Sequence, residues 1–146
     1  MPTQITSAGI TFNDATSFTS AVLAANSVGA TQIANGSVTA SKLGTNEQKQ
    51  ICKAWVNFNG TTSPGTIRSS YNVSSVTKIS TGIYTVNFTT TMADTNYSAV
   101  VCPCVSLSYS VWADSFLTTS ARIGCYTSGT TNPLDLSMLS VQIFGN

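Results

Sequence analysis

Residues 83–89 read Ile83-Tyr84-Thr85-Val86-Asn87-Phe88-Thr89, an alternation of large apolar side chains with polar ones. Successive side chains of a β-strand point to opposite faces of its sheet, so this alternation predicts a strand that buries Tyr84, Val86 and Phe88 on one face. A Ser-Thr-Gly turn precedes the stretch at residues 80–82, and a second turn-forming segment follows at 93–96. The stretch is therefore predicted to be one strand of a sheet with a single buried face.

Strand-like stretches recur on both sides of this segment, separated by short turn-rich segments and without a helical period between them. Residues 97–102 are more uniformly apolar, and we expect that strand to be buried on both faces. The predicted fold class is all-β, an antiparallel β-sandwich or open barrel of about six to eight strands over residues 49–146. The stretches are 52–58, 66–73, 75–79, 83–89, 97–102, 109–112, 121–126 and 136–144.

Composition excludes several classes of function. Charged residues make up 8% of the chain and the net charge is +1, with no basic run, which argues against nucleic acid as a partner. No stretch approaches the roughly 20 apolar residues that a bilayer span requires, and no lysine-rich amphipathic helix is present, so we expect no membrane insertion. The first residues lack the pattern of a signal peptide, so we expect the chain to be made and folded in a cytoplasm.

A ten-residue repeat lies in the N-terminal part, where residues 27–34 (SVGATQIA) match residues 37–44 (SVTASKLG). It spaces four aliphatic side chains five residues apart, which is the period of neither a helix nor a strand. One apolar side chain in five cannot enclose a core within one chain, but identical chains around an axis can bring these side chains together in layers. We therefore predict a thin trimeric stem over residues 25–48, with a flexible linker and a chance repeat as the alternative. The predicted axial residues are Val28, Ile33, Val38 and Leu43.

These segments carry a resemblance to a known family. The decads resemble the stem repeats of bacteriophage tail fibres, and GITFNDAT at residues 9–16 is similar to a short motif near the start of such fibres. Three stretches in the expected order resemble the β head that ends many of these fibres: AWVNFNG at 54–60, IRSSYNVSSV at 67–76 and GIYTVNF at 82–88. The resemblance implies a homotrimer whose extended segment at residues 1–24 attaches to tail or baseplate proteins of the virion. It also implies that the head at residues 49–146 touches the host cell.

The inventory of reactive groups argues against an enzyme. The chain has no His, so neither a Ser-His-Asp nor a Cys-His arrangement can be built. Cleavage of a glycan requires two carboxylates about 5–10 Å apart, and the head offers only Asp94, Asp114 and Asp135, of which Asp94 and Asp135 are predicted to be ordinary turn formers. A trimer could still bring acids together across subunits. We expect no catalytic residue and no cofactor.

Cysteine spacing favours packed thiols over bonds or metal ligands. The four cysteines are Cys52, Cys102, Cys104 and Cys125, and without His a zinc site would need all four. Cys102 and Cys104 are too close in sequence to pair comfortably. We expect all four to be reduced and buried as small hydrophobic side chains, with Cys52 and Cys125 as the first pair to suspect if a disulfide forms.

Candidate receptor-binding residues lie in two segments near the end of the chain. If Tyr109 and Val111 face inward, Trp112 and Asp114 face out together, placing a ring beside a carboxylate. Sugars stack on aromatic rings and hydrogen-bond to polar groups, so the candidates are Tyr109, Trp112 and Asp114, with Thr130 and Asn132 from the loop at 127–133. The alternative for Trp112 is a place in the core or a subunit interface, and for Trp55 we predict packing at the neck.

The function that these predictions favour is attachment of a virion to a host surface polysaccharide. Three heads per fibre and several fibres per particle would multiply weak single-site binding into avidity. The alternative is a structural baseplate or capsid-decoration component without receptor binding.

Overall fold

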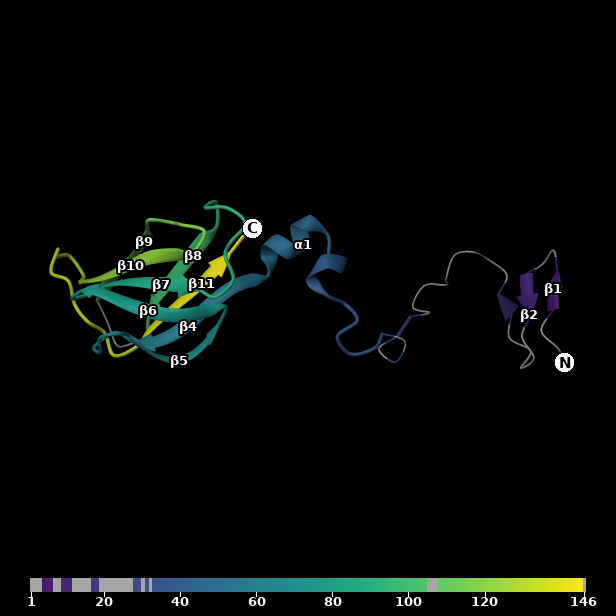
Figure 1. The fold of residues 1–146 in the computed structure, drawn as a ribbon, viewed down its shortest axis with the longest axis horizontal. Coiled ribbons are helices and arrows are strands. Elements are labelled where there is room, and N and C mark those ends of the chain that lie inside the picture. The colour runs from purple at the N-terminus through teal and green to yellow at the C-terminus, as the bar shows by residue number, and fades with distance from the viewer. Residues whose placement is uncertain are drawn as a thin grey trace. The chain divides into compact units, whose positions relative to one another are not determined.

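The structure is a computed structural model that describes residues 4–6, 9–11, 17–18, 28–29, 31, 33–104 and 108–145 (Figure 1). The chain divides into two compact units, Met1–Lys42 and Leu43–Asn146.

The first unit contains a small antiparallel sheet in the order β1-β2-β3, formed by β1 (Gln4–Thr6), β2 (Gly9–Thr11) and β3 (Ser17–Phe18). The decad repeat follows it, and its only regular element among the described residues is the 3-10 turn η1 (Ala40–Lys42). Val28, Ile33 and Val38 are 49%, 46% and 56% exposed. Aliphatic side chains of the repeat are thus open to solvent in a single chain.

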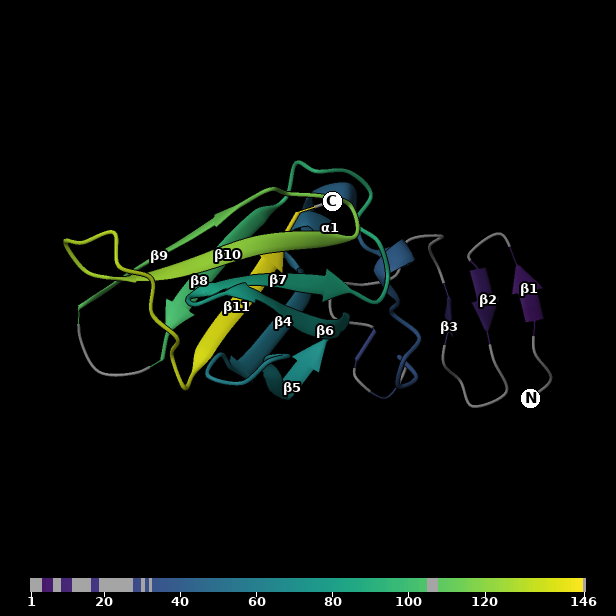
Figure 2. The same cartoon turned by 60° about the vertical axis from the view of Figure 1, so that its left-hand side comes forward.

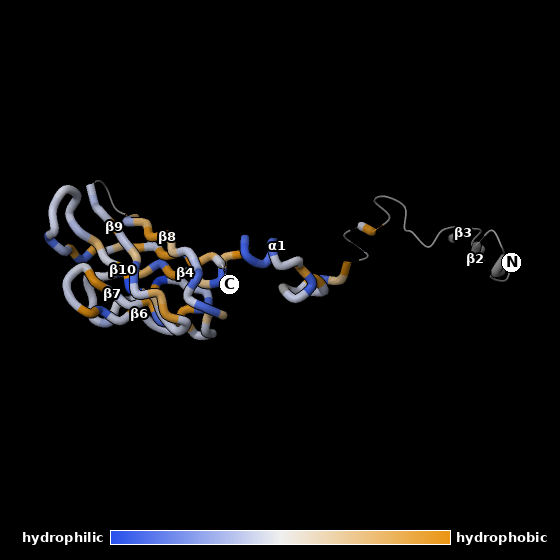
Figure 3. Tube along the Cα trace, turned by 90° about the horizontal axis from the view of Figure 1, so that it is seen from above, coloured by the Kyte–Doolittle hydropathy of each residue, from blue (hydrophilic) through white to orange (hydrophobic). Residues whose placement is uncertain are grey.

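The second unit begins with the short helix α1 (Thr45–Gln50), where the sequence had predicted the end of the stem. Its residues TNEQKQ include straight-chain helix formers, with Glu47 in the first turn and Lys49 in the last, which suits the helix dipole. The helix buries none of its residues, and Figure 3 shows it mostly in hydrophilic colours. The helix ends before the first predicted strand, and the described residues after it form strands without a further helix, as predicted.

Eight strands after α1 form two four-stranded antiparallel sheets packed as a sandwich (Figures 1 and 2). This arrangement confirms the all-β prediction. One sheet has the order β6-β7-β10-β9 and consists of β6 (Val73–Ser80), β7 (Ile83–Phe88), β10 (Ser120–Thr127) and β9 (Tyr109–Asp114). The other has the order β5-β4-β11-β8 and consists of β5 (Thr66–Tyr71), β4 (Cys52–Asn59), β11 (Leu139–Phe144) and β8 (Ser98–Pro103).

The core lies between the two sheets and follows the predicted alternation. Tyr84, Val86 and Phe88 are buried on β7, and Ala54, Val56 and Phe58 face them from β4. The rings of Phe58 and Tyr84 meet edge to face with centroids 5.2 Å apart.

Strand β8 departs from the prediction. Its exposed and half-buried residues alternate, and Val100 is 51% exposed. β8 lies at the edge of its sheet, so only the side of the strand that carries Ala99 and Val101 packs on the core. The expectation of burial on both faces was wrong because a run of apolar residues does not reveal where its strand lies in the sheet.

Asp135 is not an ordinary turn former. Its carboxylate accepts hydrogen bonds from the Gly82 N–H (2.8 Å) and the Tyr84 hydroxyl (2.7 Å) and pairs with the Lys78 ammonium (2.5 Å). The Tyr84 hydroxyl also lies 3.0 Å from the carbonyl oxygen of Gly60, at the end of β4. This Asp135 network ties the loop before β11 to both sheets.

The cysteines divide into two classes. Cys125 is fully buried and Cys52 is half-buried, whereas Cys102 and Cys104 are exposed, so the expectation of burial was wrong for the latter two. Cys52 begins β4, about 20 Å along the strand from Phe58 at 3.3 Å per residue, and Phe58 lies at the end that contacts Tyr84 near Cys125. A Cys52–Cys125 bond is therefore excluded within one chain, because bonded cysteines need Cα atoms within about 7 Å.

Candidate binding face

The candidate site lies on the outer face of the β6-β7-β10-β9 sheet. Tyr109, Val111 and Ala113 pack against the core, so the alternation of β9 puts Trp112 and Asp114 on the opposite, outer side. The structure therefore brings Trp112 and Asp114 together but places Tyr109 on the inner face, away from them.

The neighbouring strand β10 adds two residues that the sequence reading missed. Its core side chains are Ala121, Ile123 and Cys125, so Arg122 and Tyr126 point outward. The same alternation that predicted β7 could have found both residues. In the register, Arg122 lies opposite Asp114 and Tyr126 lies opposite Ser110.

Gly124 leaves the space that the Trp112 ring occupies. It lies opposite Trp112, and a Cβ atom at this position would lie 2.1 Å from carbon atoms of the indole ring. The ring therefore occupies the space directly over the glycine, and any larger residue would displace it. An aromatic side chain covering a glycine on the adjacent strand is a recognised way of stabilising a sheet near its edge.

Trp112 is flanked by the two β10 side chains that lie on either side of Gly124. The Tyr126 ring is nearly parallel to the indole, with an interplanar angle of 26° and centroids 6.1 Å apart. The Arg122 guanidinium carbon lies 5.7 Å from the indole centroid, within reach of a cation–π interaction. We call these three residues, together with Asp114, the Trp112 cluster.

Asp114 completes the cluster through a two-pronged ion pair. Its two carboxylate oxygens accept hydrogen bonds from Nε and Nη2 of Arg122, both at 2.7 Å. The hydrogen bond and charge of Arg122 lower the pKa of Asp114, and the carboxylate raises the pKa of Arg122 in return. Both groups stay charged at neutral pH and their charges cancel, while the two side chains remain 43% and 45% exposed.

One donor in the cluster has no partner. Trp112 Nε1 is buried and makes no hydrogen bond within the described part of the chain. Leaving a buried N–H unsatisfied costs about 1–3 kcal/mol, and such groups in a native fold call for an explanation.

The rest of this outer face is uncharged and rich in hydroxyl and amide groups. Asn87 on β7 donates from Nδ2 to the hydroxyl oxygens of Ser75 and Thr77 on β6, each at 3.0 Å. Thr85 lies opposite Arg122 and connects this polar area to the Trp112 cluster. Rings, hydroxyls, an amide and a neutralised ion pair thus share one sheet face.

The loop at residues 127–133 adjoins the Tyr126 end of the cluster through a bridge between Tyr126 and Pro133. The Thr130 hydroxyl donates to the Thr127 carbonyl oxygen (2.9 Å), and the Asn132 N–H donates to the Thr130 hydroxyl (3.2 Å). Thr130 and Asn132 are exposed. The structure places them in the loop, and the Thr130 hydroxyl is already engaged in holding the turn.

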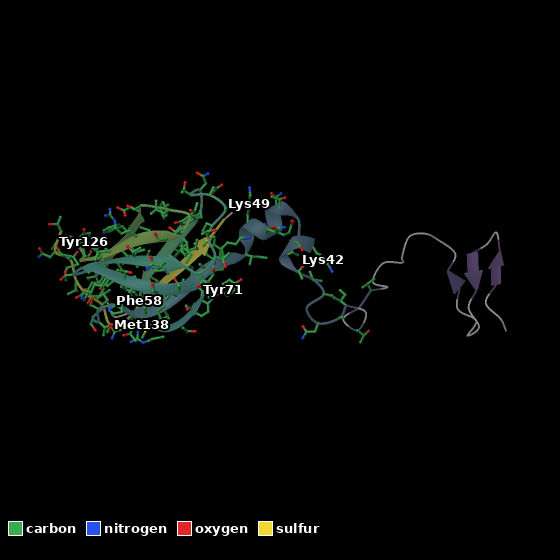
Figure 4. The ribbon with its side chains drawn as sticks, viewed as in Figure 1. Lys42, Lys49, Phe58, Tyr71, Tyr126 and Met138 are labelled. Carbon is green, nitrogen blue, oxygen red and sulfur yellow. The ribbon has the colours of Figure 1, made fainter. Side chains whose placement is uncertain are left out.

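Trp55 lies on the outer face of the other sheet. It is 36% exposed and lies opposite Tyr71 on β5, which is 58% exposed, and opposite Gln142 on β11. Figure 4 shows Tyr71 and Tyr126 at opposite ends of the sandwich. The two aromatic clusters on the outer faces of the head are therefore separate.

The carboxylates of the head are all engaged. Asp94 accepts a hydrogen bond from the Asn96 N–H at 2.7 Å, the geometry of the turn predicted for it. Asp114 pairs with Arg122 and Asp135 with Lys78.

Within the described ranges no three metal-ligating side chains come together. No helix in those ranges is long and apolar enough to cross a membrane.

Comparison of the chain with protein-family models, with curated proteins and with solved structures finds no match.

Proposed function

We propose that this protein is a virion adhesin of the tail-fibre kind, which attaches a phage to a polysaccharide on the host surface. The observation that carries the proposal is the Trp112 cluster, an assembly of rings and hydrogen-bonding groups on an exposed sheet face. The resemblance of residues 9–16 and of the decads supplies the rest: attachment of the N-terminal segment at 1–24 to tail or baseplate proteins, and trimerisation through the stem at 25–48.

The cluster contains the groups that sugar recognition uses. The rings of Trp112 and Tyr126 offer apolar area to the C–H face of a pyranose. The carboxylate oxygens of Asp114 retain lone pairs for sugar hydroxyls, and Arg122 retains N–H donors beyond those given to Asp114.

The stem supports a trimer. Val28, Ile33 and Val38 are about half exposed at a constant spacing of five residues. Three copies around an axis would cover these side chains and would place three heads on one particle component, which raises avidity.

Glycan-array binding of the purified protein tests the proposal. We expect binding to a host-surface polysaccharide, lost in Trp112→Ala and partly kept in Trp112→Phe, which preserves a ring over Gly124. Tyr71→Ala is the matched control, since it removes an exposed aromatic ring from the other sheet. Unfolding midpoints of all variants separate lost binding from lost folding, and full binding by folded Trp112→Ala would refute the assignment.

A structural role is the second candidate, favoured by the same cluster. The stack of Trp112 over Gly124 and the ion pair of Asp114 with Arg122 also fasten the edge strand β9 to β10. A baseplate or capsid-decoration component would need this firmly attached edge strand but would bind no receptor. Deleting residues 51–146 distinguishes the two: particles that assemble but do not adsorb indicate an adhesin, and particles that fail to assemble indicate a structural part.

A further inference from the structure

The sequence Cys102-Pro103-Cys104 lies outside the Trp112 cluster, on the open edge of the other sheet. Cys102 is in β8, and Cys104 continues the ladder with its N–H donating to the Met138 carbonyl oxygen at 3.2 Å. Ala99 and Val101 face the core, so the alternation puts both thiols on the outer side, and both are exposed.

The two thiols lie two residues apart on the same side of the strand. The Cys104 thiol donates to the Cys102 carbonyl oxygen at 3.5 Å and to the Ser140 hydroxyl oxygen at 3.2 Å. Ser140 lies directly opposite Cys102 in the register of β11 with β8, so the Cys104 sulfur leans back toward Cys102.

Ser140 is itself held in place, because its hydroxyl oxygen accepts a hydrogen bond from Asn57 Nδ2 at 2.8 Å. The contact between Ser140 and Cys104 therefore positions one thiol against β11, an interior strand of the sheet. This makes the pair more than two cysteines that happen to be exposed.

We propose that Cys102 and Cys104 form a two-thiolate binding site for monovalent copper, a soft ion that accepts two sulfur ligands. Soft thiolates select copper in this oxidation state, whereas zinc takes four ligands in structural sites, and no group of three metal-ligating residues forms within the described ranges. On binding, each thiol loses its proton to solvent and each sulfur forms one bond to the ion. The copper ion remains in its monovalent oxidation state, so the step needs neither oxidant nor reductant.

The test is an anaerobic titration of the reduced full-length chain with monovalent copper, held at known free concentration by a coloured chelator. We expect one ion per chain, release of two protons measured in weak buffer, and an unchanged particle mass by light scattering. Cys102→Ser and Cys104→Ser should each weaken binding by on the order of 100-fold or more, since changes outside the ligands themselves already cost about 10–100-fold.

Cys52→Ser is the matched control and should bind like the unaltered protein, because Cys52 lies at the start of β4 and is not one of the paired thiols. Unfolding midpoints show that each variant is folded, and Cys102→Ala and Cys104→Ala replace any serine variant that is not. Retained affinity in a folded variant of Cys102 or Cys104 would overturn the site. Copper-driven association of chains would also overturn it, because the ion would then bridge different molecules.

Discussion

Replacing Asp135 by Ala is expected to destabilise the head more than any other substitution of an acidic residue in it. The change removes the acceptor of the Gly82 N–H and the Tyr84 hydroxyl and the partner of the Lys78 ammonium. The side chains of Lys78 and Asp135 are only 16% and 22% exposed, so water replaces the lost contacts poorly. Tyr84 would keep its bond to the Gly60 carbonyl, but Lys78 would lose its counter-charge.

The size of the effect follows from these contacts. Removing one partner of a buried ion pair costs about 3–5 kcal/mol, and partial exposure places this pair near about 3 kcal/mol. For a unit of this size each kcal/mol lowers the melting temperature by about 4–8 °C, so we expect a fall of roughly 12–24 °C. Asp114→Ala is the matched control, because its ion pair is 43% and 45% exposed and should change the melting temperature far less.

The stability lost in Asp135→Ala should depend on pH in a defined direction. Burial acts to raise the pKa of Asp135, but the hydrogen bonds from Lys78, Gly82 and Tyr84 outweigh it and hold the pKa below its ordinary value. A carboxyl whose pKa is lower in the folded state stabilises the fold fully above its unfolded pKa, about 3.9, and loses that contribution as the pH falls through the folded pKa. The difference between the unaltered protein and Asp135→Ala should therefore be largest at neutral pH and shrink below about pH 4.

Urea unfolding at pH 7, 5 and 3 measures this difference directly. A double-mutant cycle with Lys78→Met isolates the ion pair, since the second substitution should cost less once Asp135 is gone. A loss at pH 7 no greater than that of Asp114→Ala, or a difference that stays constant down to pH 3, would refute the reasoning.

Further outcomes are expected at Gly124, in the stem and at the cysteines. Gly124→Ala should expel the Trp112 ring, because the new Cβ would lie 2.1 Å from it, and tryptophan fluorescence should report the change. Light scattering should give three times the 15.2 kDa chain mass. Ile33→Asp should cost several kcal/mol per trimer and open the stem, but not the head, to proteolysis. A stable monomer of the unaltered protein at micromolar concentration would contradict both predictions. Cys125→Ala should cost about 1 kcal/mol, and native thiol titration should detect Cys102 and Cys104 but not Cys125, whose pKa burial raises.

Local pattern was enough to predict much of the sandwich. The alternation at residues 83–89 appears as β7 with Tyr84, Val86 and Phe88 buried, and the class was all-β as predicted. Strand periodicity is a property of neighbouring residues, so it can be read without knowing which strands pair. The same reasoning placed Trp112 and Asp114 on one side of their strand, on the condition that Tyr109 and Val111 face inward.

The features that the sequence did not predict depend on contacts between residues far apart in the chain. Asp135 looked like a turn residue because Lys78, Gly82 and Tyr84, which engage it, lie more than 50 residues earlier. The apolar stretch of β8 looked doubly buried because nothing local marks a sheet edge, and that edge position also exposes Cys102 and Cys104.

The sequence determined one part of the Trp112 cluster, and the tertiary structure determined the other. The sequence by itself determined which side of each strand a residue occupies, because side-chain direction alternates with every residue. Only the pairing of β9 with β10 decided that Gly124 lies under the Trp112 ring and that Arg122 lies opposite Asp114. Register between strands is set by packing of the whole sandwich, and that information is spread over residues far apart in the chain.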